Sequence, residues 1–192
     1  MELTDEELVE RVQRGDAEEF AVLYRRHAGR IGRFLRTVGV PPADAEDLTA
    51  ETFCRALAKI DSYETRRGRK YLSYLYSIAR NLATDRIRYQ PRVFSLEDLE
   101  HGSEPSDGCH EESIVDSIRQ LEQVAQIRDA MRRLPVRDRE ILVLAYDREL
   151  GCREIMELLG KPSITAVTSH IYVAMKKLRK LVAEASANVA AR

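Results

Sequence analysis

Apolar residues recur every three or four positions along most of the chain, which is the period of an amphipathic helix. In the first ninety residues this pattern predicts a short helix after Thr4, a longer one from Phe20 to Val38, and two more over 43–60 and 71–88. No strand pattern appears in this part of the sequence. We therefore expect these helices to pack into a small all-α domain.

A second group of helical patterns fills the C-terminal part of the chain. The apolar positions predict helices over 121–134, 136–146 and 153–159. Gly160 supplies a turn after the third of these, and Ser163 caps a longer helix with one apolar face. A short helix, a glycine turn and a longer helix with a polar face form the pattern of a helix-turn-helix.

The segment between the two groups is strongly acidic. Residues 92–121 contain 2 basic and 8 acidic residues, whereas the net charge is +1 over 1–91 and +4 over 122–192. Such a segment repels itself and favours an extended linker. The predicted fold is all-α, with two small helical domains joined by a flexible acidic linker, and the C-terminal one is a helix-turn-helix. The expected units are residues 1–91, 92–120 and 121–184, with a frayed tail over 185–192.

The composition argues against several classes of protein. The longest apolar runs are a few residues, and the acidic N-terminus has no signal core, so we expect no membrane insertion and a cytoplasmic location. Three widely spaced cysteines argue against a disulfide framework. A polar linker explains His101, Cys109 and His110 better than a metal site does. No catalytic constellation or phosphate loop appears, so we expect no enzyme activity, no metal and no cofactor.

The predicted helix over 71–88 combines aromatic and basic side chains. Tyr71, Tyr74 and Tyr76 lie within six residues. The basic residues immediately before them are Arg66, Arg67, Arg69 and Lys70. Cations meet phosphates and rings stack on unpaired bases, so this mixture is typical of a surface for single-stranded nucleic acid. A tyrosine-rich core helix after a solvated basic loop explains the same stretch equally well.

The second helix of the helix-turn-helix carries candidate contacts to duplex DNA. They are Thr165, Thr168, Ser169, His170, Tyr172, Lys176 and Lys177. In this motif the early residues of the second helix enter the major groove and later ones flank phosphates. Hydroxyl groups can bond several base edges, whereas lysines add affinity without sequence information. The alternative is a plain helical hairpin with a basic, solvated face.

Four motifs occur in order along the chain. They are G-D-x-x-E-F-x-x-L-Y at 15–24, D-A-E-D-L-T-x-E-T-F at 44–53, S-I-A-R-N-L-A-x-D-R at 77–86 and R-L-P-V-R-D-R-E-I-L-V-L at 133–144. With the helix-turn-helix that follows, they resemble bacterial sigma factors of the extracytoplasmic-function (ECF) group over nearly the whole chain. The resemblance implies a dissociable subunit of RNA polymerase that recognises minus-10 and minus-35 promoter elements and directs promoter-specific initiation.

The resemblance also implies roles for single residues. Asp44, Asp47 and Glu51 would dock on the clamp coiled coil of the beta-prime subunit of core polymerase, although the helix dipole alone also explains acidic residues here. The residues that would recognise and melt the minus-10 element are Arg66, Arg67, Arg69, Lys70, Tyr74, Asn81, Asp85, Arg86 and Arg88. The helix from Thr165 to Lys177 would bind the minus-35 element. An anti-sigma factor is a further implied partner, which nothing in the sequence identifies.

The chain departs from the family pattern at several positions. It contains no tryptophan, and Tyr74 stands where the melting helix of the family often has one. Thr168, His170 and Val173 occupy positions that are usually basic in the family, which implies either weaker direct contacts or a different minus-35 sequence. The competing hypothesis is a stand-alone regulator that binds duplex DNA through the C-terminal domain. A single-strand surface around Tyr74 would discriminate between the two, because a duplex binder does not need one. An enzyme based on Cys109 and His110 is a third, disfavoured hypothesis.

Overall fold

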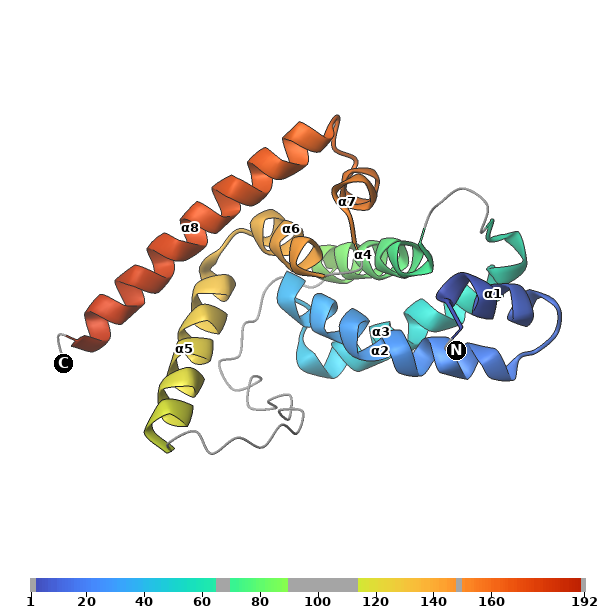
Figure 1. The fold of residues 1–192 in the computed structure, drawn as a ribbon, viewed down its shortest axis with the longest axis horizontal. Coiled ribbons are helices and arrows are strands. Elements are labelled where there is room, and N and C mark those ends of the chain that lie inside the picture. Colours follow the sequence, from blue (N-terminus) through green and yellow to red (C-terminus); the bar gives the residue numbers. More distant parts are fainter. Residues whose placement is uncertain (1–2, 65–69, 90–113, 148–149, 191–192) are drawn as a thin grey trace.

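A computed structural model describes residues 3–64, 70–89, 114–147 and 150–190 (Figure 1). Every regular element in these ranges is helical, so the predicted all-α class is confirmed. The elements are α1 (Asp5–Gln13), α2 (Glu18–Val38), α3 (Pro42–Ala58), a short 3₁₀ turn η1 (Ile60–Ser62), α4 (Tyr71–Tyr89), α5 (Ile114–Arg133), α6 (Val136–Tyr146), α7 (Cys152–Leu159) and α8 (Ile164–Ala190).

Side-chain and backbone chemistry close in sequence explains the start of α1, the end of α2 and the start of α3. Thr4 caps α1 in the predicted capping box: its Oγ1 accepts from Glu7 N at 3.3 Å, and its own N donates to Glu7 Oε2 at 2.8 Å. Gly39 ends α2 with φ of 110°, a left-handed conformation that favours glycine. Pro42 then occupies the first turn of α3, where its fixed φ suits the helix and its missing N–H costs nothing.

Helix α4 packs against both α2 and α3. Its predicted apolar stripe of Leu72, Leu75, Ala79 and Leu82 is buried, as the spacing requires. Tyr71 and Tyr76 are buried as well, so two of the three clustered tyrosines belong to the core. The core interpretation of this stretch is therefore correct for those two rings, while the opposite face of α4 stays available for other contacts.

In the C-terminal part, α5, α6 and α7 all pack against α8. Helix α5 begins at Ile114, inside the segment expected as linker (92–120), and the earlier part of that segment lies outside the described residues. Helix α8 continues to Ala190, past the expected start of fraying at 185. Its last turns are rich in alanine, a strong helix former, and Ser186 Oγ donates to Gln126 Oε1 of α5 at 3.1 Å.

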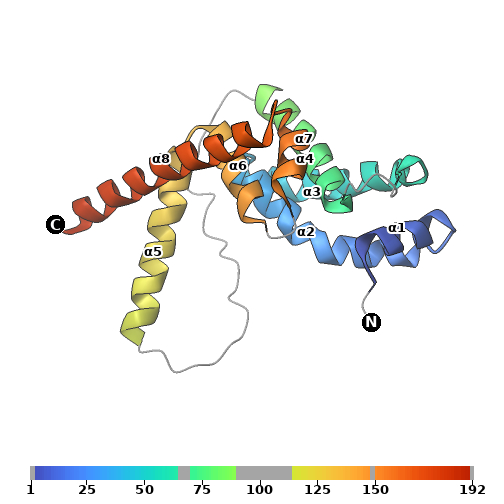
Figure 2. The ribbon, with the colours of Figure 1, turned by 45° about the horizontal axis from the view of Figure 1, so that its top comes forward.

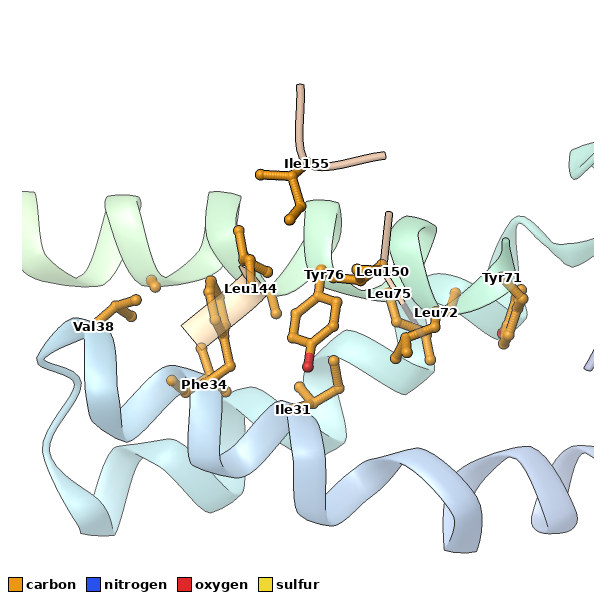
Figure 3. Packing of buried hydrophobic residues seen from close by; sticks show 14 of the residues in the cluster. Ile31, Phe34, Val38, Tyr71, Leu72, Leu75, Tyr76, Leu144, Leu150 and Ile155 are labelled. Carbon is orange, nitrogen blue, oxygen red and sulfur yellow. The ribbon is translucent and has the colours of Figure 1, made fainter. Parts of the chain in front are cut away.

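The two groups of helices share one buried core. Helices α6 and α7 lie between α1–α4 and the long pair α5 and α8 in both views (Figures 1 and 2). Leu144 of α6 and Ile155 of α7 are buried in the same apolar cluster as Phe34 of α2 and Tyr76 of α4 (Figure 3). The helical pattern predicted both groups, but it did not predict that they would pack against each other.

Candidate nucleic-acid interface

The three predicted docking residues on the acidic face of α3 differ in their exposure and in their ion pairs. Asp47 is exposed. Glu51 is also open to solvent, and its Oε1 lies 2.6 Å from Arg55 Nε one turn later. Asp44 instead forms a two-point ion pair with Arg86 of α4, at 2.8 and 2.9 Å. The structure therefore leaves Asp47 and Glu51 facing outward, while Asp44 joins α3 to α4.

The face of α4 opposite the core holds three of the predicted minus-10 residues. Asn81 and Asp85 are exposed. Tyr74 is half-buried, and its ring centre lies 5.1 Å from that of Tyr63, which follows η1. Burial raises the pKa of Tyr74 above its ordinary value, so the phenol is neutral at physiological pH and keeps its hydroxyl proton as a donor. An aromatic ring and two polar groups thus share one accessible face.

A cavity of about 450 Å³ opens beside Tyr74. Its walls come from η1 and the residues next to it, from α4, and from α7 of the helix-turn-helix. The lining residues are Lys59, Ser62, Tyr63, Glu64, Ser73, Tyr74, Ser77, Arg80, Asn81, Glu157 and Leu158. Hydroxyl, amide, aromatic and charged groups converge here, so the cavity suits a planar polar group such as an unpaired base.

The basic residues predicted around α4 divide three ways. Arg66, Arg67 and Arg69 lie outside the described residues, as does the side chain of Arg88. Lys70 is exposed, and its Nζ lies 3.6 Å from Glu154 Oε1 of α7. Arg86 is engaged by Asp44 of α3. Of the predicted basic residues that the structure describes, only Lys70 thus lies at the edge of the α4 face, and it contacts Glu154 of α7.

The helix-turn-helix forms as predicted. Gly151 caps α7, Gly160 ends it with φ of 60°, and Ala166 N donates to Ser163 Oγ at 3.1 Å at the start of α8. Six of the seven predicted minus-35 residues are exposed along α8: Thr165, Thr168, Ser169, Tyr172, Lys176 and Lys177. The helix therefore presents hydroxyl groups near its start, and an aromatic ring and a cation one to two turns later.

Two of the predicted minus-35 residues, His170 and Lys177, pair with a buried carboxylate. Asp138 of α6 is 4% exposed. Its Oδ1 lies 2.8 Å from His170 Nε2, and its Oδ2 accepts from Lys177 Nζ at 2.6 Å. His170 is thereby turned toward α6, and its role as a minus-35 contact stays a prediction. Lys177 keeps about half of its side chain exposed while it is held by the same carboxylate.

Sequence reasoning missed the structural importance of three acidic residues of the C-terminal group: Asp138, Glu140 and Asp147. Asp138 and Glu140 fall at the start of a predicted helix, where the dipole alone explains an acidic side chain. Yet Glu140 is 8% exposed, and Asp147 accepts a hydrogen bond from α4. The run Asp138–Glu140 has no local feature that marks it for burial, because the partners of Asp138 and Glu140 lie on α8 and α4.

The described residues offer no evidence for other kinds of site. No group of three His, Cys, Asp or Glu side chains within them could hold a metal ion, while His101, Cys109 and His110 lie outside the described ranges. None of the helices in those ranges combines the length and apolar character needed to cross a bilayer.

Comparisons with known proteins agree with an all-helical fold that ends in a helix-turn-helix. Residues 23–93 match the family Sigma-70 region 2. The ECF RNA polymerase sigma factor SigW of Bacillus subtilis is 31% identical over 188 residues, which cover 94% of this chain and 97% of that protein. The ECF sigma factor BldN of Streptomyces coelicolor is 33% identical over 92% of this chain, which spans only 65% of BldN.

A solved structure supports the fold. CnrH in complex with the cytosolic domain of CnrY superposes with a TM-score of 0.68 at 23% identity, over 94% of this chain and 97% of that one. The near full-length match to SigW decides the family: the chain belongs to the ECF sigma factors, proteins that bind RNA polymerase and initiate promoter-specific transcription. The family resemblance of the four sequence motifs is thereby confirmed.

Proposed function

We propose that this chain brings core RNA polymerase to promoters through two separate DNA surfaces, α4 for the minus-10 element and α8 for the minus-35 element. One observation carries the proposal: the chain combines an exposed helix-turn-helix face with an aromatic and polar cavity on α4. The first surface suits duplex DNA, and the second suits an unpaired strand. A stand-alone duplex binder has no need of the second surface.

On α8 we assign base contacts to the hydroxyl-bearing residues Thr165, Thr168 and Ser169, which are exposed near the helix start. Tyr172 and Lys176 lie further along and flank the phosphates. Lys177 adds a phosphate contact from its position beside Asp138. His170 acts differently, because its ring is held against Asp138 and so orients α8 on α6.

On α4 we assign minus-10 recognition to Tyr74, Asn81 and Asp85, with the basic residues before the helix as phosphate contacts. The ring of Tyr74 is positioned by Tyr63 and is available for stacking at the edge of the cavity. Base–aromatic stacking contributes about 1–3 kcal/mol per base. Arg86 supports this face from its ion pair with Asp44.

Docking on the clamp coiled coil of core polymerase falls to Asp47 and Glu51, whose carboxylates face solvent. We expect the double charge reversal Asp47→Lys with Glu51→Lys to abolish co-purification with core polymerase, since both contacts become repulsive. The matched control is Asp16→Lys with Glu18→Lys, which reverses two exposed charges between α1 and α2. Unchanged co-purification of the α3 variant, with an unchanged circular dichroism spectrum, would contradict the docking role.

The protein as proposed has no catalytic chemistry and acts in the cytoplasm, where core polymerase and promoters are found. An anti-sigma factor is the regulatory partner that membership of the family suggests. The function as a whole is tested by transcription in vitro with purified core polymerase and genomic DNA, followed by mapping of start sites. Transcripts that require the chain support the proposal, whereas duplex binding without any such transcripts would favour the stand-alone regulator.

A further inference from the structure

The 3₁₀ turn η1 leads into one wall of the cavity beside Tyr74. Tyr63, which follows η1, lines this cavity together with Tyr74 and Asn81 of α4. The ring centres of Tyr63 and Tyr74 are 5.1 Å apart, and the two ring planes meet at 41°. Buried Tyr71 meets the ring of Tyr63 edge-on, with 5.4 Å between the ring centres. The position of Tyr63 therefore sets the shape of the space that an unpaired base would enter.

The turn η1 is short, and few of its own hydrogen bonds hold it. Ser62 N and Oγ donate to Lys59 O at 3.1 and 2.8 Å, and Tyr63 N donates to Ile60 O at 3.0 Å. Short 3₁₀ segments have poor hydrogen-bond geometry and seldom extend beyond a few residues. Ile60 is buried and anchors the start of the turn, whereas Asp61 and Ser62 are exposed. The end of the turn is therefore sensitive to contacts from elsewhere in the chain.

Gln13, the last residue of α1, supplies such a contact. Its Nε2 donates to Ile60 O at 2.6 Å and to Tyr63 O at 2.9 Å, across 47 and 50 residues of sequence. A primary amide carries two N–H donors on one nitrogen, so a single uncharged group can satisfy both carbonyls. One carbonyl lies at the start of η1 and the other directly after it. Gln13 thus joins both ends of the turn to α1.

Helix α1 is itself anchored, so Gln13 is held on a fixed support. The helix packs against α2, α4 and η1, and three of its side chains are buried: Leu8, Val9 and Val12. At its start, Asp5 Oδ2 lies 2.6 Å from Nε2 of fully buried His27 in α2. Glu6 Oε1 accepts from Tyr71 N, at the start of α4, at 3.4 Å. Helix α1 therefore contacts the helix that carries Tyr74 as well as the turn that precedes Tyr63.

We infer that Gln13 is a positioning residue for the minus-10 surface, and that it acts through Tyr63 to set which base the cavity accepts. This inference rests on the proposed function and extends it to α1, which carries none of the residues assigned to DNA. Polar groups of α4 that line the cavity, among them Ser77 and Asn81, can read the edges of a base that stacks on Tyr74. Tyr63 limits how that base lies, because it bounds the same cavity from the side of η1. A displaced turn would admit several bases, so Gln13 governs selectivity more than affinity.

Two substitutions at one position separate the hydrogen bonds of Gln13 from the shape of its side chain. Gln13→Glu keeps the shape and removes both N–H donors, whereas Gln13→Lys is longer and presents N–H donors again. Holoenzyme containing each variant is titrated with single-stranded minus-10 oligonucleotides from a mapped promoter, in which every base is replaced in turn. For Gln13→Glu, discrimination against wrong bases should fall about tenfold at one position of the element and less than about twofold at the others. Gln13→Lys should stay within about twofold of wild type throughout.

Tyr63 provides the second arm of the test, because Gln13 is inferred to act through it. Tyr63→Ala should lower discrimination at the same position of the element. Adding Gln13→Glu to Tyr63→Ala should lower it by less than about twofold more, since residues that act through one another are not additive. Losses that multiply, or that fall on different positions, overturn the inference. So does a loss in Gln13→Lys as large as that in Gln13→Glu, because the donors would then not be the cause.

Gln126→Glu is the matched control, since it makes the same change at a half-buried residue of α5. It should discriminate between bases as the wild type does, and a loss equal to that of Gln13→Glu would assign the effect to charge and overturn the inference. A smaller folded fraction would weaken binding to minus-35 duplex and to core polymerase equally. For Gln13→Glu both should stay within about twofold of wild type, and a proportional loss in all assays overturns the inference. If circular dichroism shows that Gln13→Glu does not fold, Gln13→Met, which is uncharged and also lacks the donors, takes its place.

The wild-type holoenzyme separates failure of this inference from failure of the proposed function. If it shows no preference among the single-stranded oligonucleotides, the proposed minus-10 role of α4 is wrong, and the role of Gln13 falls with it. If it shows a preference that Gln13→Glu and Gln13→Met preserve at every position, only the role of Gln13 is overturned.

Discussion

At the scale of single residues, Asp138 shows how one carboxylate orients a recognition helix. Burial would raise its pKa, but hydrogen bonds with Lys177 and His170 outweigh burial and hold the pKa below the ordinary value of 3.8. The charged form is therefore the one that the fold stabilises. Because Asp138 lies on α6 and its partners on α8, the carboxylate fixes how α8 is oriented on α6.

We expect Asp138→Asn to lower the free energy of unfolding at pH 7 by about 1–3 kcal/mol, since the hydrogen bonds to Lys177 and His170 lose a charged, buried acceptor. A lowered pKa in the folded state gives stabilisation that is present well above pH 3.8 and lost as pH falls through the folded value. The difference between variant and wild type in urea unfolding should therefore shrink toward pH 2. Exposed Asp129→Asn is the control, and a pH-independent difference would contradict the argument.

We expect the exposed residues of α8 to divide into those that read sequence and those that add affinity. Alanine substitution of Thr168 and Ser169 should change the preferred minus-35 sequence with little change in salt dependence. Lys176→Ala should weaken binding to all sequences alike and reduce the slope of log K against log salt by about 1. Fluorescence anisotropy of polymerase holoenzyme on a set of minus-35 variants measures both effects. Uniform weakening by both substitutions would argue against this division.

At the scale of elements, α4 combines a buried face with a face that lines a cavity. Its leucine stripe, with Tyr71 and Tyr76, forms the core, while Tyr74 and Asn81 face the cavity. The sequence left two interpretations of this helix open, a core element or a nucleic-acid surface. The structure buries Tyr71 and Tyr76 and leaves Tyr74 half-buried beside the cavity, so the core interpretation is correct for two of the rings and a nucleic-acid surface at Tyr74 stays a prediction. Tyr74 lies about 60° around the helix from Tyr71, whose ring centre is 6.0 Å away, and roughly 160° from Tyr76.

We expect Tyr74→Ala to impair transcription from duplex templates about tenfold more than from a template with a pre-opened bubble, because the ring is proposed to hold melted DNA by stacking. Tyr74→Phe keeps the ring and should stay close to wild type on both templates. Abortive-product assays with core polymerase provide the measurement. Equal loss on both templates would point to a defect in folding or in polymerase binding instead.

At the scale of the whole molecule, the two helical groups that the sequence predicts as separate domains pack together around a common core. The apolar part of this contact involves α2, α4, α6 and α7, and Asp147 and Glu140 add charge to it. A contact that mixes apolar packing with charged groups can separate when a partner supplies better contacts.

The helices and their inward faces followed from the sequence because helix formation depends on hydrogen bonds between residues four apart and on apolar periodicity. The capping box at Thr4, the turn at Gly160 and the recognition helix from Ile164 could all be predicted on that basis. So could the exposed hydroxyl groups of α8 and the outward Asp47 and Glu51.

The pairings between helices could not be predicted from the sequence and became apparent only in the tertiary structure. Asp138 meets His170 across 32 residues, and Tyr76 meets Asp147 across 71. No local pattern encodes such pairs, because a charged residue looks the same in sequence whether it faces water or another helix. The order of helices along the chain thus indicated a promoter-reading protein, whereas the long-range contacts decided which of its charged side chains stay exposed and which pair across helices.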